Sequence, residues 1–566
     1  ACDLDTDGAD VRMNLALALH ERGRLDEAEA LFHEVLQREP DNLRALVNRG
    51  LLLNQRGDPE AEILLRRARA LGAHDHRVAL ALGAYLRDRD ELKEALPLLE
   101  EAMAGDPANH ACLSALAVCY LGLGRHEQAA ALFRRLRDSG TAHLGALDIA
   151  LFVGAHVAEI GPEELFALHR RYGELVEAAV VPHAFWDNDR DPDRRFRVGF
   201  VSGDLRQHAM ANFVTPLWEG LDRSRVEVFA YSNHRTNDEV TARLRSLTDG
   251  WCDIVGMSDE MVANRIRQDR IDVLVDLSGH TGFNRLGVFA FKPAPVQISW
   301  GGYPATTGLS RMDYYVADVF WAPPGTMDDQ VTEKLLLNPG TSIFHPEDPS
   351  PDVGPAPCIR NSFVTFGSFN RMNKINPATI RLWSQVLRRV PDSRMVIGAI
   401  DGDSAERLRG QFSEQGVDPS RIRFFPRSKV FEYLQRQTDV DINLDAMPYT
   451  GGTTTYHALW MGVPTLTLAG KTLPARGGCS IMRGAGLAPF VAESEDEFVD
   501  RAVHWASPSQ WDALSAIRAS TRDIMRRTMI GKTAPAIQGF EDGIRWAWSQ
   551  WCQGLPPQPY VIPRRA

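Results

Sequence analysis

The chain has 566 residues, of which 44% are hydrophobic and 24% are charged, and this composition is typical of a globular protein. Its formal net charge of −11 disfavours nucleic acid as the main partner. No apolar run reaches the ~18 residues that a membrane span requires. Four aspartates among the first ten residues exclude the basic start of a signal peptide.

Seven cysteines are scattered along the chain, and no two of them have the Cys-x-x-Cys spacing of a zinc ribbon or a redox dithiol. A core of this size needs no disulfides for its stability. We therefore expect a reduced, cytoplasmic protein without a membrane partner.

The first quarter of the chain repeats itself with a period of about 34 residues. The predicted turns between the two helices of each unit fall at Gly23, Gly57, Asp90 and Gly124. An alanine follows three of these turns by five positions, and prolines close the first and third units. This pattern is typical of tetratricopeptide repeats, whose helix pairs stack into a superhelix with a concave groove. We expect about four repeats over residues 1–139.

Residues 140–194 are predicted to form a helical connector that ends in a polar linker, and the periodicity changes after it. Short apolar strands then alternate with helices, which indicates parallel sheets covered on both faces. The stretch His345–Cys358 contains five prolines and divides the series in two. The sequence thus predicts an α plus α/β protein with two doubly wound lobes, over residues 195–345 and 362–535. Residues 346–361 link the lobes, and residues 536–566 form a C-terminal helix and tail.

Ligands of such sheets bind beyond the carboxyl ends of the strands, so we expect a site between the lobes. The most informative segment is Leu444–Pro464, in which a strand ends, Gly451 and Gly452 make a turn, and three threonines open a helix. Amides, hydroxyls and the helix dipole make an anion site there. The local sequence leaves an ordinary threonine N-cap open as the alternative.

Three further segments carry candidate residues at the same edge. In Phe366–Ile380 the loop after a strand carries Lys374, whose charge could neutralise a diphosphate leaving group. In Ser202–Phe213, Asp204 and His208 could orient or deprotonate an acceptor. The stretch Leu277–Gly308 has glycine-rich turns that let backbone amides approach a ligand. Taken singly, the lysine is compatible with a solvated surface residue and the histidine with a structural one.

Several familiar sites are absent. There is no G-x-x-x-x-G-K-[ST], H-E-x-x-H or G-x-S-x-G segment. Two Asp-x-Asp pairs, Asp401/Asp403 and Asp439/Asp441, could hold a metal–diphosphate, but such pairs are expected by chance among 74 acidic residues. The helix start and Lys374 already compensate the negative charge of a diphosphate, so we predict neither a metal nor any other cofactor.

Four segments, in one order behind the repeats, resemble the protein O-linked N-acetylglucosamine (O-GlcNAc) transferases and their plant Spindly-type relatives. They read RVGFVSGDLRQHAMANF, KPAPVQISWGGYPATTG, FGSFNRMNKINPATI and TGGTTTYHALWMGVPTLTLAG. The chain is similar to a bacterial homologue, because it lacks the long insertion between the lobes of the animal enzymes.

The resemblance implies the two-lobed GT-B fold and an inverting, metal-independent glycosyltransferase. The implied donor is UDP-N-acetylglucosamine (UDP-GlcNAc), and the acceptor is a Ser or Thr hydroxyl of a protein that the repeat groove selects. By the same resemblance, the catalytic residues are His208, Lys374 and Asp204. The residues that it implies for donor binding are Gly302, Asn370, Arg371, Gly451, Gly452, Thr453, Thr454 and His457.

Three positions depart from the family pattern. Arg371 stands where the animal enzymes have glutamine, and Gly452 replaces a histidine just before the threonines. His457 occupies the place of an acidic residue that binds the ribose hydroxyls, although an imidazole can also hydrogen-bond a diol. Two alternatives therefore stay open. One is a Spindly-type protein O-fucosyltransferase that uses GDP-fucose, and the other is a nucleotide-binding repeat scaffold with little turnover.

Overall fold

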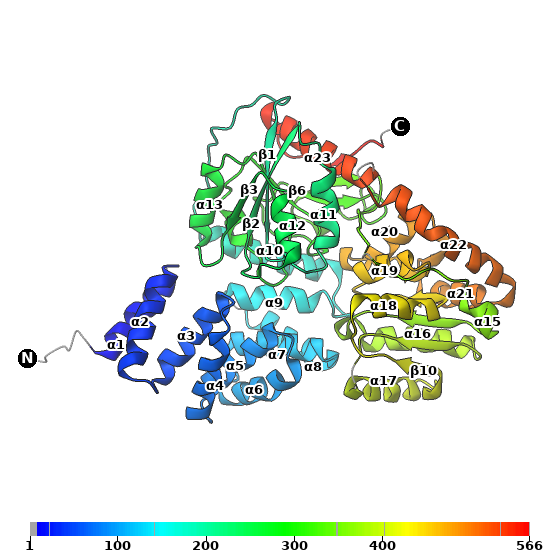
Figure 1. Ribbon diagram of the computed structural model, residues 1–566, viewed down its shortest axis with the longest axis horizontal. Coiled ribbons are helices and arrows are strands. Elements are labelled where there is room, and N and C mark those ends of the chain that lie inside the picture. Colours follow the sequence, from blue (N-terminus) through cyan, green and yellow to red (C-terminus); the bar gives the residue numbers. More distant parts are fainter. Residues whose placement is uncertain are drawn as a thin grey trace, which may run out of the picture.

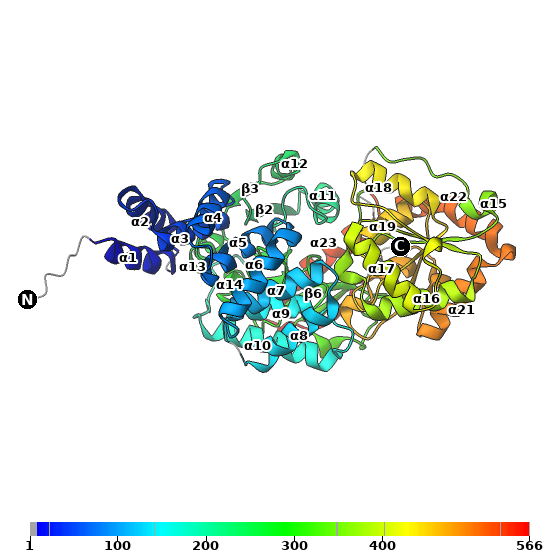
Figure 2. The same cartoon turned by 90° about the horizontal axis from the view of Figure 1, so that it is seen from below.

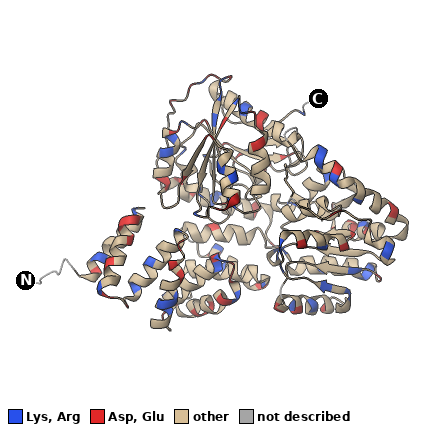
Figure 3. Cartoon of the chain, viewed as in Figure 1, with Lys and Arg blue, Asp and Glu red and all other residues tan. Residues whose placement is uncertain are grey.

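The computed structural model of the chain describes residues 8–21, 23–140, 142–346, 349–400, 402–531 and 534–564, with Glu21 described by its backbone alone. An array of paired helices leads into two parallel sheets, each flanked by helices (Figure 1). Acidic and basic residues are interspersed along the array and both lobes (Figure 3). Within the described ranges, no helix is long and apolar enough to cross a membrane.

The array begins with four helix pairs. They are α1 (Ala9–Glu21), α2 (Leu25–Arg38), α3 (Leu43–Gln55), α4 (Glu60–Leu71), α5 (His76–Asp88), α6 (Leu92–Gly105), α7 (His110–Gly122) and α8 (His126–Asp138). The predicted turn residues Gly23, Gly57, Asp90 and Gly124 have φ angles of 72°, 66°, 65° and 70°. This left-handed conformation favours glycine and, among other residues, aspartate and asparagine. The prediction of a helix–turn–helix repeat is confirmed.

Helix α9 (Leu144–Gly154) is shared between the array and the first lobe. Its Ala146, Ala150 and Val153 are buried in the core of the repeats, whereas Leu147 and Leu151 are buried in a core of the first lobe. Helix α10 (Pro162–Ala178) follows on the lobe side. Because one helix supplies both cores, the last repeat cannot move away from the first lobe without exposing apolar surface.

The first lobe contains an eight-stranded parallel sheet in the order β14-β7-β6-β5-β4-β1-β2-β3. Its strands are β1 (Phe196–Ser202), β2 (Val226–Ser232), β3 (Gly250–Asp253), β4 (Val273–Asp276), β5 (Val296–Ser299), β6 (Tyr314–Asp318), β7 (Lys334–Asn338) and β14 (Tyr560–Val561). Its helices include α11 (Ala211–Gly220), α12 (Glu239–Ser246), α13 (Asp259–Gln268) and α14 (Leu286–Ala290).

The end of the described chain returns to this first lobe. Helix α23 (Pro535–Cys552) packs Phe540, Ile544 and Trp548 into the lobe's core, and β14 pairs in parallel with β7. Figure 1 shows α23 in red beside the green first lobe. The predicted C-terminal helix therefore exists, whereas the pairing of its tail with the sheet was not predicted from the sequence.

The second lobe contains a six-stranded parallel sheet in the order β10-β9-β8-β11-β12-β13. Its strands are β8 (Thr365–Ser368), β9 (Arg394–Ile397), β10 (Ile422–Phe424), β11 (Ile442–Leu444), β12 (Thr465–Leu468) and β13 (Val491–Ala492). Its helices are α15 (Pro357–Asn361), α16 (Pro377–Arg389), α17 (Gly402–Glu414), α18 (Val430–Arg436), α19 (Thr453–Trp460), α20 (Gly477–Gly484), α21 (Glu495–Ala506) and α22 (Trp511–Thr528). The predicted fold of repeats and two doubly wound lobes is confirmed.

The third and fourth repeats also contact the second lobe, as the view from below suggests (Figure 2). Lys93 pairs with Asp403 at 2.8 Å, and Arg427 pairs with Asp90 at 3.1 Å. The Arg407 guanidinium donates to the carbonyl of Leu123. The array thus contacts both lobes.

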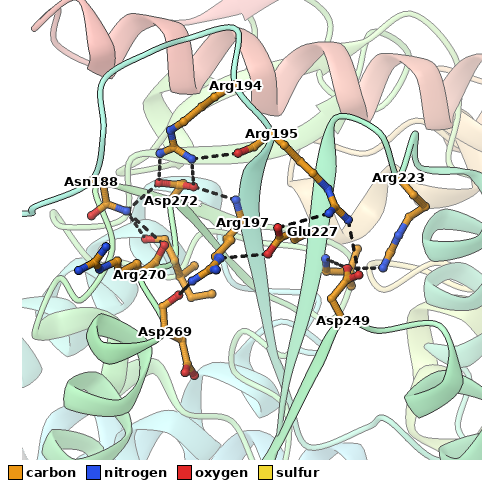
Figure 4. A network of polar contacts seen from close by, with 12 residues as sticks. Asn188, Arg194, Arg195, Arg197, Arg223, Glu227, Asp249, Asp269, Arg270 and Asp272 are labelled. Carbon is orange, nitrogen blue, oxygen red and sulfur yellow. Dashed lines mark hydrogen bonds and ion pairs between the residues drawn. The ribbon is translucent and has the colours of Figure 1, made fainter.

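Charged side chains form a network at the amino ends of β1 and β4, on the edge of the sheet opposite the predicted site (Figure 4). The carboxylate of Asp272 is almost fully buried and accepts two hydrogen bonds from the Arg194 guanidinium, at 2.6 and 2.9 Å. It also accepts the backbone amide of Arg197 at 2.7 Å. The network therefore anchors the polar linker to the first strand and takes no part in the predicted chemistry.

We expect Asp272→Ala to lower the free energy of opening of β1 by about 3 kcal/mol, because Arg194 and a buried amide lose their acceptor. Asp249→Ala is the matched control, since Asp249 lies in the same network but is half-exposed, and it should cost about 1 kcal/mol or less. Hydrogen exchange of the β1 amides measures both values. Equal losses in the two variants would contradict the assigned role of Asp272.

Candidate functional site

The loop after β11 is organised by one buried carboxylate. Asp445 follows the strand and is 3% exposed. Its Oδ1 accepts the backbone amides of Ala446, at 2.9 Å, and Gly451, at 2.8 Å, and its Oδ2 accepts the Thr467 hydroxyl at 2.8 Å. Burial raises the pKa of Asp445, while these hydrogen bonds and the nearby Lys374 act in the opposite direction. The carboxylate thus closes the loop from Ala446 to Gly451 into one unit.

Lys374 reaches this loop from a neighbouring strand end. It lies on the short turn η2 (Met372–Lys374), between β8 and α16. Its Nζ donates to the carbonyl of Thr450 at 2.7 Å and lies 4.5 Å from the centre of the Tyr449 ring. Burial lowers the pKa of Lys374 to about 8, and the Asp445 carboxylate opposes that shift. The ammonium is therefore protonated at neutral pH, half-buried, and held beside the glycine turn.

Helix α19 starts at this turn, with Gly452 as its N-cap. No side chain caps the helix, and the amides of Thr455 and Tyr456 bond to the carbonyl of Gly452. Thr453 and Thr454 are the first two helical residues, so the alternative of a threonine N-cap is wrong. The Thr454 hydroxyl donates to Oδ1 of Asn370 at 3.1 Å. The segments that carry Lys374 and the threonines therefore meet, as the sequence predicted for parallel strands.

The two glycines of the turn have different surroundings. A Cβ at Gly451 would lie 2.4 Å from the Thr455 hydroxyl and 2.9 Å from the Thr454 hydroxyl, so only glycine lets the loop lie against the helix start. A Cβ at Gly452 would meet no atom within 4 Å. The space in front of α19 is thus open at the position where the resembled family has a histidine.

The first lobe contributes Asp204 and His208, which follow β1. Asp204 is buried, and its Oδ1 lies 3.5 Å from Nδ1 of the half-buried His208. Burial raises the pKa of Asp204. Burial lowers the pKa of His208, and Arg206 and Arg371 lower it further, whereas Asp204 raises it. Arg371 belongs to the second lobe and precedes the Lys374 turn. The charge of Arg371 lowers the pKa of His208 and thus acts across the junction of the lobes.

The glycine-rich turn after β5 contacts the segment after His208 and packs with Tyr449 of the loop before α19. A Cβ at Gly302 would lie 2.0 Å from the carbonyl oxygen of Leu277, so the turn is pressed against the end of β4. Gly301 lies against Met210, two residues after His208. Tyr303 is buried in a cluster that Tyr449 packs against. All four predicted segments therefore converge at the junction of the lobes.

His457 lies one helical turn after Thr453, on the same face of α19. It is 7% exposed, and its ring makes edge contacts with Phe344 and Tyr433. Burial lowers the pKa of His457 to about 4, so the ring is neutral. Among the described residues, nothing forms a hydrogen bond with its Nε2. This unpartnered nitrogen is buried, one helical turn from the start of α19.

Two cavities are lined by other residues than these. One of about 540 Å³ opens in the array and is lined by first helices of the repeats, α3, α5 and α7, and by α9. Its wall is mainly apolar and includes Val47, Leu51, Ala84 and Ile149. The other, of about 640 Å³, lies where β10 leads into α18 and is lined by Arg427, Lys429 and Arg436 among others.

Of the two Asp-x-Asp pairs, only Asp439/Asp441 lies wholly within the residues that the structure describes. Within the described ranges, His, Cys, Asp and Glu side chains nowhere gather in groups of three or more that could hold a metal. The Asp441 carboxylate is buried and accepts the amides of Cys358 and Thr365. Asp401 lies outside the described residues.

Sequence reasoning missed Asp445, Tyr449 and His156, all of which are within one or two contacts of Lys374. Asp445 carried a weak signal, since an aspartate at the end of an apolar strand is oriented toward the ligand edge. Tyr449 and His156 carried none, because their significance lies in a stack between segments almost 300 residues apart. The structure alone reveals that contact.

The family described as Glycosyl transferase family 41 matches residues 175–345 and 358–530, and tetratricopeptide-repeat families match residues 6–38, 13–76 and 86–143. The chain is similar to proteins named as probable UDP-N-acetylglucosamine--peptide N-acetylglucosaminyltransferase SPINDLY. It is 36% identical to that of Arabidopsis thaliana and 34% identical to that of Petunia hybrida, with 70% and 71% of this chain aligned.

In both cases the alignment covers 44% of the relative, so the chain spans under half the length of these curated relatives. A solved structure, an O-GlcNAc transferase mutant of Thermobaculum terrenum, superposes with a TM-score of 0.70 and 30% identity. That match covers 98% of this chain and 100% of the other. The bacterial structure therefore shares the whole layout of repeats and two lobes.

Proposed function

Because the chain belongs to glycosyl transferase family 41, we propose that it transfers N-acetylglucosamine from UDP-GlcNAc to Ser or Thr hydroxyls of proteins, with inversion and without a metal. The observation that carries the proposal is the contact between the Lys374 turn and the loop before α19. It puts one ammonium, two threonine hydroxyls and the first amides of a helix beside one open glycine turn. These groups are suited to a diphosphate, whose charge grows as the sugar departs.

The acceptor side of the reaction belongs to the first lobe in this proposal. The acceptor oxygen attacks the anomeric carbon of the sugar, the bond from that carbon to the phosphate oxygen breaks, and UDP leaves with the bonding electrons. The hydroxyl proton must pass to a base. His208 is suited to take it, because burial lowers its pKa and Asp204 lies 3.5 Å from its ring to stabilise the cation that forms.

The unpartnered Nε2 of His457 supports a nucleoside close to the start of α19, where it can hydrogen-bond a ribose hydroxyl. The second candidate function is fucose transfer from GDP-fucose. It gains support from the higher identity to SPINDLY proteins, at 33–36%, than to the protein named SEC of Arabidopsis thaliana, at 28%. The names of both groups describe N-acetylglucosaminyltransferases, so UDP-GlcNAc is the first proposal.

Calorimetric titration with UDP and GDP distinguishes the two donors and tests the absence of a metal. We expect UDP to bind with the same affinity in EDTA and in Mg²⁺, because Lys374 and α19 compensate the diphosphate. Transfer from UDP-GlcNAc to acceptor proteins, followed by mass spectrometry, completes the test. Binding that EDTA abolishes would contradict the metal-free mechanism, and tighter binding of GDP would favour GDP-fucose. Binding without transfer would favour a repeat scaffold with little turnover.

Lys374→Ala should reduce kcat by ~10²–10³, with a smaller loss of UDP affinity, because the diphosphate carries more charge in the transition state than in the bound donor. Lys471→Ala is the matched control, since Lys471 is exposed on a loop of the same lobe. Steady-state kinetics and UDP titration of both variants give the two quantities. An unchanged kcat in Lys374→Ala would remove this lysine from the mechanism.

The repeats supply the proposed contact with the acceptor protein. The cavity of about 540 Å³ has a mainly apolar wall formed by three successive repeats and α9. An extended acceptor segment could place apolar side chains there and be held at high local concentration beside the lobes. Helix α9 joins this wall to the core of the first lobe, so the groove and the junction of the lobes are fixed relative to each other.

Val47→Glu and Ala84→Glu should each lower transfer to a protein acceptor by about tenfold or more, because they put a charge into the apolar wall. UDP affinity should stay within error. Ala104→Glu is the matched control, since Ala104 is exposed on α6, a helix that does not line the cavity. Transfer to a short peptide is measured in parallel. A fall in UDP affinity in folded groove variants would contradict this division of roles.

A further inference from the structure

A buried histidine of the connector stands next to the Lys374 turn. His156 follows the end of α9 and is 2% exposed. Its Nδ1 lies 2.9 Å from the carbonyl oxygen of Phe152, to which it donates. Burial lowers the pKa of His156 to about 3, so the ring is neutral and its Nε2 is an acceptor.

The ring of His156 contacts both neighbours of the Lys374 ammonium. Its Nε2 accepts the side-chain amide of Asn373 at 3.4 Å, and Asn373 precedes Lys374 on the turn. Its face stacks on Tyr449, with ring centres 4.2 Å apart and planes inclined by 11°. The Tyr449 ring in turn lies 4.5 Å from Nζ of Lys374. One side chain thus supports the backbone turn of Lys374 and the aromatic ring beside its charge.

The array contacts the same turn a second time. Nε2 of His126, at the start of α8, lies 3.2 Å from the carbonyl oxygen of Met372. Gly124, in the turn before α8, lies against the Met372 side chain, and a Cβ there would be 2.2 Å from its methyl group. The turn η2 connects β8 to α16, and each of its three residues also contacts another part of the chain. Met372 contacts the array, Asn373 the connector and Lys374 the loop before α19.

We propose that His156 is a positioning residue of the donor site, which fixes Lys374 by stacking on Tyr449 and by accepting the hydrogen bond of Asn373. The inference rests on the proposed function, because it takes Lys374 to be the group that compensates the diphosphate. It assigns part of the donor site to the connector, although neither lobe contains His156. An error of ~1 Å in the position of a catalytic group can cost 10²-fold in rate, so a rigid support of Lys374 affects turnover.

The two contacts can be separated by substitution. His156→Phe keeps a ring for the stack and loses the acceptor, whereas His156→Gln keeps an acceptor and loses the stack. His156→Ala removes both and lets water approach Tyr449 and Lys374. The charged groups that face Lys374 are Asp445, on the loop of β11, and Arg371, on its own turn, and all variants keep them. A change in the pKa of Lys374 is then due to the lost ring.

The test begins with the pKa of Lys374, which needs no activity. The chain has only seven lysines, so NMR of protein with ¹³C-labelled lysine resolves them, and Lys374→Met assigns the signal. In the native protein we expect a value of about 8. In His156→Ala we expect a rise of about one unit, as water restores the solvation of the ammonium. His156→Phe, which keeps the ring, should leave the value within about 0.3 units.

Steady-state kinetics provide the second measurement. His156→Ala should lower kcat by about tenfold to a hundredfold, and His156→Phe and His156→Gln should fall between it and the native protein. Val153→Ala is the matched control, because Val153 is buried on α9 in the repeat core and lies outside the cluster around Tyr449. It should lower thermal stability and leave both kcat and the Lys374 pKa unchanged.

Each outcome decides a separate point. A His156→Ala protein with native kcat and a native Lys374 pKa would overturn the positioning role. Equal changes in Val153→Ala would overturn it too, since the effect would then be general loosening of α9. If the native protein neither binds UDP nor transfers sugar while the Lys374 pKa still responds to His156→Ala, the proposed function fails and the support of Lys374 by His156 stands.

Discussion

The carboxylate of Asp445 lies at the end of a central strand and is almost fully buried, and it is held by three hydrogen bonds. It accepts two backbone amides of the following loop and the Thr467 hydroxyl, and it acts on the Lys374 ammonium. A buried carboxylate is costly unless such partners surround it. The loop before α19 therefore has one low-energy shape, and the site depends on that shape.

The same shape fixes what the loop presents. With Gly451 held against Asp445, the carbonyl of Thr450 turns to Lys374, and Gly452 becomes the N-cap of α19. Asn376 and Thr379, at the start of α16, bond to the carbonyl of Met447 in the same loop. The positive group and the helix start are thus brought together by backbone geometry before any ligand arrives. An anion that binds there pays little for ordering the protein.

The sequence predicted the fold well where local rules decide it. The turn positions of the repeats follow from residues that tolerate positive φ, and the alternation of apolar strands with helices predicts the two lobes. It also predicted that the segments of Lys374, the threonines and His208 would meet, because parallel strands end at one edge.

The remaining features depend on contacts between distant segments, which local patterns cannot specify. The return of α23 and β14 to the first lobe joins Tyr560 to Leu336, more than 200 residues apart. The stack of His156 on Tyr449 joins the connector to the second lobe. A buried histidine in a helical stretch looks like any core residue from sequence alone. Its neutral state and its acceptor nitrogen become visible only when its partners are known.

Several polar contacts join the two lobes at their junction, and these contacts affect how the site forms. Asp318 of β6 accepts the hydroxyl of Ser480 on α20 at 2.6 Å, and burial raises the pKa of Asp318 to about 6. The Trp321 indole donates to the carbonyl of Leu473 at 2.7 Å. The array adds its own contacts with both lobes.

In a two-lobed enzyme, the site can form when the lobes close on a ligand, or it can be formed before the ligand binds. Here the chain crosses between the lobes twice, once before α15 and once before α23, and α9 and His156 tie the array to both lobes. Opening would have to break the polar contacts at Asp318 and Trp321 and separate His156 from Tyr449. The geometry therefore favours a site that is largely formed in advance, with the array acting as the third wall of the junction.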